Sequence, residues 1–234
     1  HIAPKTSPET RPMKGLSPLM LTLVTAQDMR ADLGDIFVRG KTLTQWAAEA
    51  IAEIRADFVK PDLKAVMEVV GPNGEIYDHF DGRLLNPGHS IEAAWFILRE
   101  ARHLGDESMQ RLGLDMLDWM WARGWDREHG GLVYGYAPDG TVCDSDKYFW
   151  VQAESFASAW RLWRATNDSR YLQQYQDTWD WAWRHLVDHT HGAWYRIVDA
   201  HGQKLENTKS PAGKVDYHTM GACWDVLRVG GLQA

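Results

Sequence analysis

The chain has 234 residues, of which 44% are hydrophobic and 24% are charged, which suits a globular unit or part of a larger one and excludes a disordered tail. Its 25 Lys and Arg residues against 32 Asp and Glu residues give a formal net charge of −7. This charge repels phosphate backbones, so we expect no nucleic-acid partner.

The two cysteines, Cys143 and Cys223, indicate neither a disulfide framework nor a zinc site. We therefore expect a reducing, cytoplasmic compartment, no metal and no other cofactor. The sequence contains no continuous apolar run long enough to span a bilayer, and its first segment carries charges among prolines. A membrane span and a secretion signal are therefore not expected.

The N-terminal half is predicted to begin with a loop over residues 1–16, because prolines recur there without apolar periodicity. A helix is expected from Ser17-Pro18 to about Gly34, and a second over 43–58, where Pro61 follows. The alternation over 65–80 predicts a short hairpin.

The C-terminal half shows helical spacing in five segments, separated by turn-rich stretches. The predicted helices are 89–104, 107–123, 147–166, 169–187 and 217–229. Hairpins are predicted at 130–142 and 192–205.

Two stretches of the sequence are near copies. HGGLVYGYAPDG at 129–140 and HGAWYRIVDAHG at 191–202 are each flanked by a helix pair. A helix pair plus hairpin that repeats is typical of an α/α toroid. A ring of six such pairs needs about 370 residues at this period. We therefore expect an all-α (α/α)6 barrel that is incomplete here, with N-terminal helices missing and residues 1–234 forming one catalytic domain.

Among ten histidines, His89 is a candidate for chemistry. It follows Asn86-Pro87-Gly88 and is predicted in the first turn of an apolar helix, with Glu92 one turn later. A carboxylate one turn away can hold the ring in one tautomer. A capping or buried structural histidine would give the same pattern. The second candidate, His218, lies at another junction of loop and helix, and the same structural alternative applies to it. His129 and His191 open the two hairpins, which indicates a role in the turns.

A pair of imidazoles suits the removal and return of a proton next to a carbonyl. In KYFWVQAES, Trp150 and Glu154 are spaced i, i+4 at the start of a helix. Tryptophan can stack on a sugar and the carboxylate can bind its hydroxyls, although a carboxylate there also stabilises the helix dipole.

The segments GRLLNPGHSIEAAWFILREARHLGD, GWDREHGGLVYGYAPDG, KYFWVQAES and DYHTMGACWDVL resemble the N-acylglucosamine 2-epimerase family throughout the chain. The resemblance implies an (α/α)6 barrel and interconversion of sugars at C2. It further implies that His89 and His218 are the general acid and base, that Glu92 supports or binds near His89, and that Trp150 and Glu154 line the sugar pocket.

The function expected from this resemblance is the interconversion of N-acylglucosamine and N-acylmannosamine through an enediolate. The apolar SPLMLTLV resembles the N-acylglucosamine branch, whereas Leu21 stands where mannose isomerases and disaccharide epimerases of the family resemble one another in carrying a histidine. The alternatives are a mannose-type aldose-ketose isomerase, a cellobiose 2-epimerase, and an inactive fragment or binding module. A glycoside hydrolase would use two carboxylates, for which Asp144, Asp146 and Glu154 are candidates. The expected partner is a small sugar, with a homodimer or an N-terminal segment completing the barrel.

Overall fold

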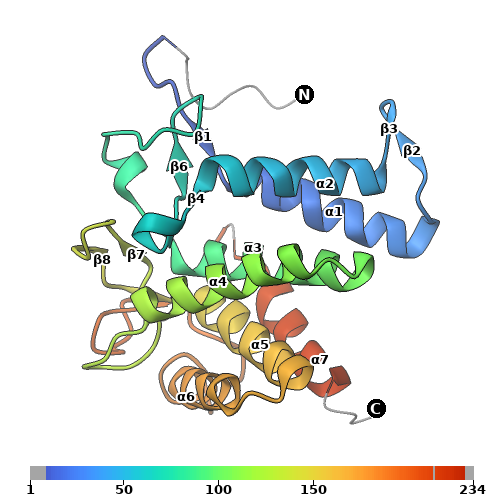
Figure 1. Cartoon of the computed structure of the whole chain (residues 1–234). Helices are drawn as coiled ribbons and strands as arrows, with labels where there is room; N and C mark the ends of the chain where they lie inside the picture. The colour runs from blue at the N-terminus through green and yellow to red at the C-terminus, as the bar shows by residue number, and fades with distance from the viewer. Residues whose placement is uncertain (1–8, 213, 230–234) are drawn as a thin grey trace. The chain divides into compact units, whose positions relative to one another are not determined.

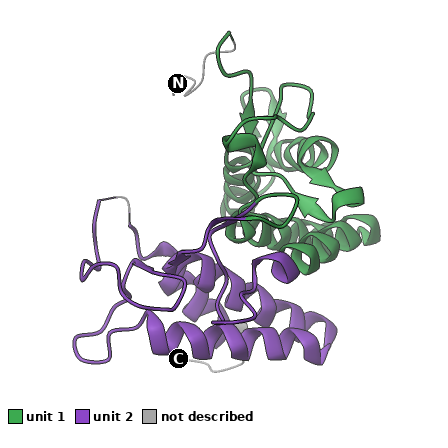
Figure 2. Ribbon diagram, turned by 90° about the vertical axis from the view of Figure 1, so that its left-hand side faces the viewer, with its two compact units in different colours: residues 1–120, 137–141 green, residues 121–136, 142–234 purple. Residues whose placement is uncertain are grey.

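The computed structural model describes residues 9–212 and 214–229, and these form two compact units (Figures 1 and 2). Unit 1 comprises residues 1–120 and 137–141, and unit 2 comprises 121–136 and 142–234. Of the predicted N-terminal loop, residues 1–8 lie outside the described part. Within that part, no helix is both long enough and apolar enough to cross a lipid bilayer.

Unit 1 is built on four helices joined by short strands. Helix α1 packs on α2 and on α3, and Gly113 allows α4 to approach α3 closely, because a Cβ there would lie 2.6 Å from a Leu98 side-chain carbon. The helices are α1 (Ser17–Leu33), α2 (Leu43–Glu53), α3 (Pro87–Leu104) and α4 (Glu107–Gly124). The last turn of α4 belongs to unit 2. A π-helical turn (Ile54–Phe58) extends α2, and 3-10 turns lie at Pro61–Leu63 and Asp81–Arg83.

The strands of unit 1 pair differently from the prediction. Strand β6 (Val69–Val70) pairs with β1 (Lys14–Gly15), within the segment expected to be a loop. The hairpin predicted over 65–80 is wrong. Strand β5 (Ala65–Val66) instead pairs with β4 (Val59–Lys60), and β2 (Phe37–Val38) pairs with β3 (Lys41–Thr42). The apolar alternation marked buried strands, but it carries no information on partners distant in the chain.

Unit 2 contains three of the five helices predicted for the C-terminal half, with ends that differ from the prediction by less than one helical turn; the other two are α3 and α4. Helix α5 packs on both α6 and α7. The elements are β7 (Gly135–Tyr136), β8 (Val142–Asp144), β9 (Lys147–Tyr148), α5 (Phe149–Thr166), α6 (Ser169–His185), β10 (Ile197–Val198) and α7 (Tyr217–Val229). β7 pairs with β8, and β9 pairs with β10.

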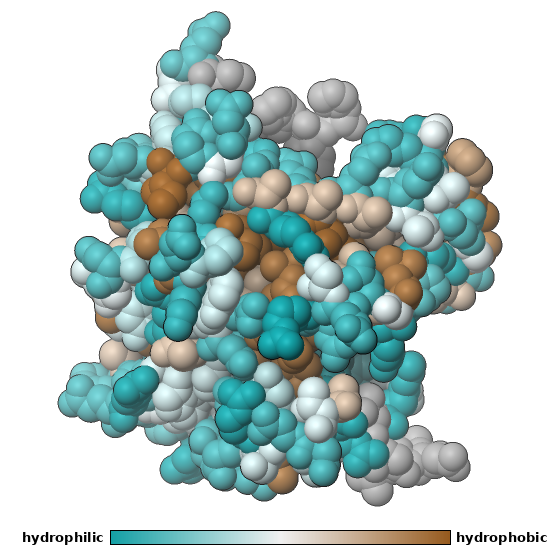
Figure 3. Space-filling model, in the orientation of Figure 1, coloured by the Kyte–Doolittle hydropathy of each residue, from teal (hydrophilic) through white to brown (hydrophobic). Residues whose placement is uncertain are grey.

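The core of unit 2 lies where α5, α6 and α7 meet, and it is rich in aromatic side chains. Phe156 is 1% exposed and packs edge-on against Trp179, with 5.2 Å between ring centroids. Hydrophilic residues cover most of the face of the molecule drawn in Figure 3, with smaller apolar areas between them. Four of the 13 tryptophans pack in the aromatic clusters of this unit: Trp150, Trp179, Trp181 and Trp194.

The repeat predicted from the two hairpins is present in the structure. Helices α3 and α5 begin at Pro87 and Phe149, the same spacing as that between the hairpins, and both have 18 residues. Each is followed by a left-handed C-cap residue, Gly105 in the first copy and Asn167 in the second. The isolated bridge between Trp125 and Leu132 recurs as the one between Val187 and Trp194. The two copies thus agree in hydrogen bonding as well as in sequence.

Each hairpin turn is organised by an aspartate. Oδ1 of Asp126 accepts a hydrogen bond from the backbone N–H of His129, and Oδ1 of Asp188 accepts one from that of His191. The turn role expected for both histidines is confirmed. A lysine pairs with each aspartate at the same spacing along the chain, Lys147 with Asp126 and Lys209 with Asp188.

The turns differ at one position. Gly131 and its equivalent Ala193 both have positive φ, 75° and 63°. A Cβ at Gly131 would lie 2.8 Å from ring atoms of Trp181, whereas the second copy holds an alanine in a conformation that costs an L-residue about 1–2 kcal/mol. Glycine is therefore required in the first copy by contact and is replaced in the second at a cost in strain.

Candidate active site

His89 lies in the first turn of α3, as predicted. The side-chain oxygen of Asn86, the N-cap residue, accepts a hydrogen bond from the backbone N–H of His89 at 3.1 Å, and Pro87 occupies the first helical position. Asn86 is buried, at 1% exposure. The loop therefore fixes the backbone of His89 while its side chain remains 27% exposed.

The imidazole of His89 is held by Glu68. Nδ1 of His89 lies 2.9 Å from Oε1 of Glu68, which is 15% exposed and lies between β5 and β6. A carboxylate only accepts hydrogen bonds, so the ring donates from Nδ1 and the neutral ring keeps its lone pair on Nε2. The second oxygen of Glu68 is buried and has no hydrogen-bond partner among the described residues. Glu68 is therefore placed to orient His89.

Sequence reasoning missed Glu68. The sequence pattern placed the carboxylate that supports His89 at Glu92, one turn along the same helix. Glu92 lies on α3 and is 7% exposed. Its role stays a prediction. The signal for Glu68 was present, because it is the single charged residue in the run Ala65–Val70, whose hydrophobic neighbours are mostly buried. A carboxylate at such a place needs a partner.

His218 in unit 2 has a similar arrangement. It lies in the first turn of α7, and its Nδ1 lies 2.7 Å from Oε1 of Glu154 on α5. Glu154 is 7% exposed and His218 21% exposed in their side chains. The carboxylate again occupies Nδ1 and leaves Nε2 as the base in the neutral ring. Packing of α7 on α5 creates this pair, which local sequence patterns cannot predict.

Aromatic rings surround His218 within unit 2. Its ring centroid lies 5.7 Å from that of Trp150, 4.8 Å from Tyr217 and 6.2 Å from Phe149. These contacts restrict the rotation of the imidazole and exclude water from part of its surface. Trp150 thus stands beside a candidate base, and its proposed contact with a sugar stays a prediction.

Asp144 and Asp146 are two of the residues considered for a hydrolase; Asp144 is the last residue of β8, and Asp146 lies in the turn between β8 and β9. Oδ1 of Asp144 accepts a hydrogen bond from the backbone N–H of Asp146 at 2.9 Å. Burial and the charges of Asp144 and Asp199 raise the pKa of Asp146. The contact of Asp144 with backbone is that of a turn-forming residue.

Comparison with known proteins identifies the relatives of this chain. Residues 44–222 match the family model for N-acylglucosamine 2-epimerase. A D-mannose isomerase from Marinomonas mediterranea is 52% identical over 142 residues, which are 61% of this chain and 36% of the isomerase. The human N-acylglucosamine 2-epimerase is 27% identical over 218 residues, 91% of this chain and 49% of the epimerase.

Solved structures agree in fold. A crystal structure of D-mannose isomerase superposes with a TM-score of 0.83 and 37% identity, covering 96% of this chain and 58% of the isomerase. A cellobiose 2-epimerase from Bacillus thermoamylovorans superposes with a TM-score of 0.79 at 20% identity, covering 92% of this chain and 53% of the epimerase. These neighbours have the (α/α)6 barrel fold, which confirms the predicted fold class. The chain spans between about a third and three fifths of the length of these relatives.

Proposed function

Because this chain belongs to the N-acylglucosamine 2-epimerase family, we propose that the protein moves a proton at C2 of an open-chain aldose, with His89 and His218 as acid and base. The observation that carries the proposal is that each imidazole donates from Nδ1 to its own glutamate, at 2.9 and 2.7 Å. In each neutral ring the basic lone pair is then on Nε2, which is the atom that such a transfer would use.

The reaction begins from the open chain, because the ring form has no free carbonyl to acidify the proton on C2. Nε2 of one histidine takes this proton, and the electron pair of the broken C–H bond forms the C1–C2 double bond of an enediolate, with the negative charge on O1. Glu68 or Glu154 stabilises the imidazolium that results. Return of a proton to C2 from the opposite face restores the C1 carbonyl and inverts the configuration. Return to C1, together with transfer of the O2 proton to O1, produces a ketose.

Of these two outcomes, we propose aldose-ketose isomerisation of a mannose-type sugar. The support is the 52% identity to a D-mannose isomerase, against 27% to the human N-acylglucosamine 2-epimerase. The second candidate is N-acylglucosamine 2-epimerisation, which the sequence favoured. Leu21 supports epimerisation, because mannose isomerases of the family resemble one another in carrying a histidine at the position where this chain has an apolar leucine.

Incubation with D-mannose, N-acetylmannosamine and cellobiose in deuterated water is expected to distinguish these reactions. Proton NMR should show a ketose formed from mannose, with deuterium at C1. A C2 epimer that carries deuterium at C2 would instead establish an epimerase. Unchanged sugars without deuterium in all three incubations would contradict the proposed proton transfer.

Glu68→Gln is expected to lower kcat by about 10- to 100-fold, the usual effect of losing a carboxylate that orients a reactive imidazole. The glutamine keeps the size of the side chain but not the negative charge, so the imidazolium loses its stabilisation. The pH profile of kcat should shift with it, which a purely structural residue would not cause. Glu75→Gln, on the loop after β6, is the control and should retain parental kinetics; an unchanged pH profile for Glu68→Gln would contradict the assigned role.

A further inference from the structure

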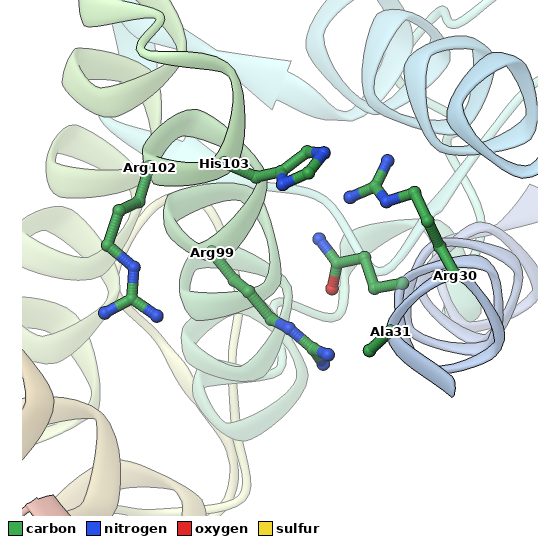
Figure 4. Close-up of a pocket in the computed structure, with 6 residues that line it drawn as sticks. Arg30, Ala31, Arg99, Arg102 and His103 are labelled. Carbon is green, nitrogen blue, oxygen red and sulfur yellow. The ribbon is translucent and has the colours of Figure 1, made fainter. Parts of the chain in front are cut away.

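A hollow of about 270 Å³ lies in unit 1 between the C-terminal ends of α1 and α3 (Figure 4). Residues on α1 form one wall and residues on the last two turns of α3 form the other. The lining side chains are Gln27, Arg30, Ala31, Arg99, Arg102 and His103. His89 lies at the other end of α3, about 20 Å away at a rise of about 1.5 Å per residue, so the hollow is separate from the candidate active site.

The lining is positive in a chain whose net charge is −7. It contains three arginines and a histidine and no carboxylate. The charged neighbours that pair with the lining are Glu100, which is 1% exposed, and Asp28. Glu100 is almost fully covered and Asp28, although 61% exposed, is paired with Arg99. Arg102 and His103 have no such pair among the described residues, so the lining keeps an excess of positive groups.

Arg30 is a fixed part of this wall. Its guanidinium donates to both carboxylate oxygens of Glu100, at 2.8 and 2.7 Å. Gln27 donates to the same carboxylate at 3.0 Å and to the backbone oxygen of Phe96 at 2.9 Å. Burial alone would raise the pKa of Glu100, but the hydrogen bonds from Arg30 and Gln27 outweigh it and the pKa is lowered. The charge of Glu100 therefore holds the arginine in place.

The opposite wall offers hydrogen-bond donors of which only some have a partner among the described residues. Arg99 and His103 extend from α3 toward Arg30 and Ala31 (Figure 4). Asp28 takes one N–H of Arg99, at 2.6 Å, and the remaining N–H groups have no partner among the described residues. His103 and Arg102 are exposed at the end of the helix.

We propose that this hollow binds a phosphate group, either inorganic phosphate or the phosphate of a monoester. Guanidinium forks match the spacing of phosphate oxygens, and charge-assisted hydrogen bonds to them are about twice as strong as neutral ones. The volume lies just below the range of drug-sized pockets, which begins at roughly 300 Å³, and this suits a small anion. The fork of Arg30 is already held by Glu100, so Arg30 adds positive charge on one wall. The remaining donors of Arg99 and His103 on the other wall supply the hydrogen bonds to the anion.

The same basic residues would also suit a purely structural role, because cations in the last turn of a helix stabilise its dipole. The two roles differ in their response to ligand. A dipole role makes each variant less stable and leaves phosphate without effect, whereas a binding role makes phosphate stabilise the protein by mass action.

Calorimetric titration of the protein with inorganic phosphate and with phenyl phosphate, at constant ionic strength and pH 7, tests the proposal. Both compounds should bind saturably at millimolar concentration or below. Tighter binding of phenyl phosphate than of inorganic phosphate identifies a monoester as the ligand. Equal affinity for the two identifies the free ion. Arg99→Gln and His103→Gln should each weaken binding about 10-fold.

Arg111→Gln is the matched control, because it removes the same charge from an exposed position on α4 outside the hollow. It should leave the affinity within about twofold of the parent. The proposal is overturned if the parent shows no saturable binding, if Arg111→Gln weakens binding as much as Arg99→Gln, or if phosphate fails to raise the melting temperature of the parent.

Discussion

Replacing His89 or His218 by alanine is expected to lower the rate of proton exchange at C2 of the substrate by about 10²–10⁴-fold or more. Each imidazole has Nδ1 occupied by a carboxylate, so in the proposed reaction its Nε2 exchanges the proton. Loss of either ring removes one of the two transfers. Proton NMR of the sugar in deuterated water measures the exchange directly, without depending on which product forms.

The matched control is His191→Ala. His191 is 78% exposed in its side chain, and its backbone N–H is the group that supports the turn. This variant should exchange at the parental rate and show the parental circular dichroism spectrum. If a folded His89→Ala or His218→Ala variant also exchanges at the parental rate, that histidine has no part in the reaction.

Lys147→Met is expected to destabilise the protein by about 3–5 kcal/mol, the cost of removing one member of a buried ion pair. Lys147 is 0% exposed in its side chain, and its ammonium lies 2.8 Å from Asp126. Methionine fills a similar volume but leaves the carboxylate of Asp126, whose side chain is only 16% exposed, without the ammonium that neutralises it. Urea denaturation at pH 7 measures the free energy of unfolding.

The repeat supplies the control, Lys209→Met in the equivalent pair. The side chain of Lys209 is 23% exposed, although that of Asp188 is only 8% exposed. Water can therefore enter from the lysine side and hydrate the carboxylate, and the expected loss is about 1–2 kcal/mol. Equal losses in the two variants would show that burial does not decide the strength of these pairs.

The same experiment has a pH dependence that follows from Asp126. Burial alone would raise the pKa of this carboxyl, but the hydrogen bonds from Lys147 and from backbone N–H groups outweigh it, and the pKa lies below its ordinary value. A carboxyl with a lowered pKa stabilises the fold above the unfolded pKa, about 3.9, and this stabilisation is lost as the pH falls through the folded pKa. The difference between parent and Lys147→Met should therefore shrink in acid.

The helices and the repeat could be predicted from the sequence because both depend on local patterns. Asn86-Pro87 predicted the start of α3 and the place of His89, and the structure shows the N-cap hydrogen bond that creates it. The two His-Gly turns predicted the repeating unit. In each case the signal lies within one or two helical turns of the feature.

The partners of the candidate bases could not be predicted in this way. Glu68 reaches His89 across 21 residues, and Glu154 reaches His218 across 64. The pairing of Val69–Val70 with Lys14–Gly15 likewise depends on chain segments that sequence periodicity does not connect. Contacts of this kind arise from packing, so an unaccompanied charge in an apolar run is the best advance indication of them.

Equivalent residues of the two copies keep one constant spacing along the chain as far as Lys209, the equivalent of Lys147. The next helix departs from this spacing: α7 begins at Tyr217, later than a second step of the same length as that from α3 to α5 would place it. Between Asp126 and Lys147, one added residue would pull the ammonium out of reach of its carboxylate. The residues that lengthen the second copy lie between Lys209 and α7, in a stretch that includes the exposed Ser210. This is where an insertion, such as an epitope or a fluorescent label, can be accommodated while both lysine–aspartate pairs keep their spacing.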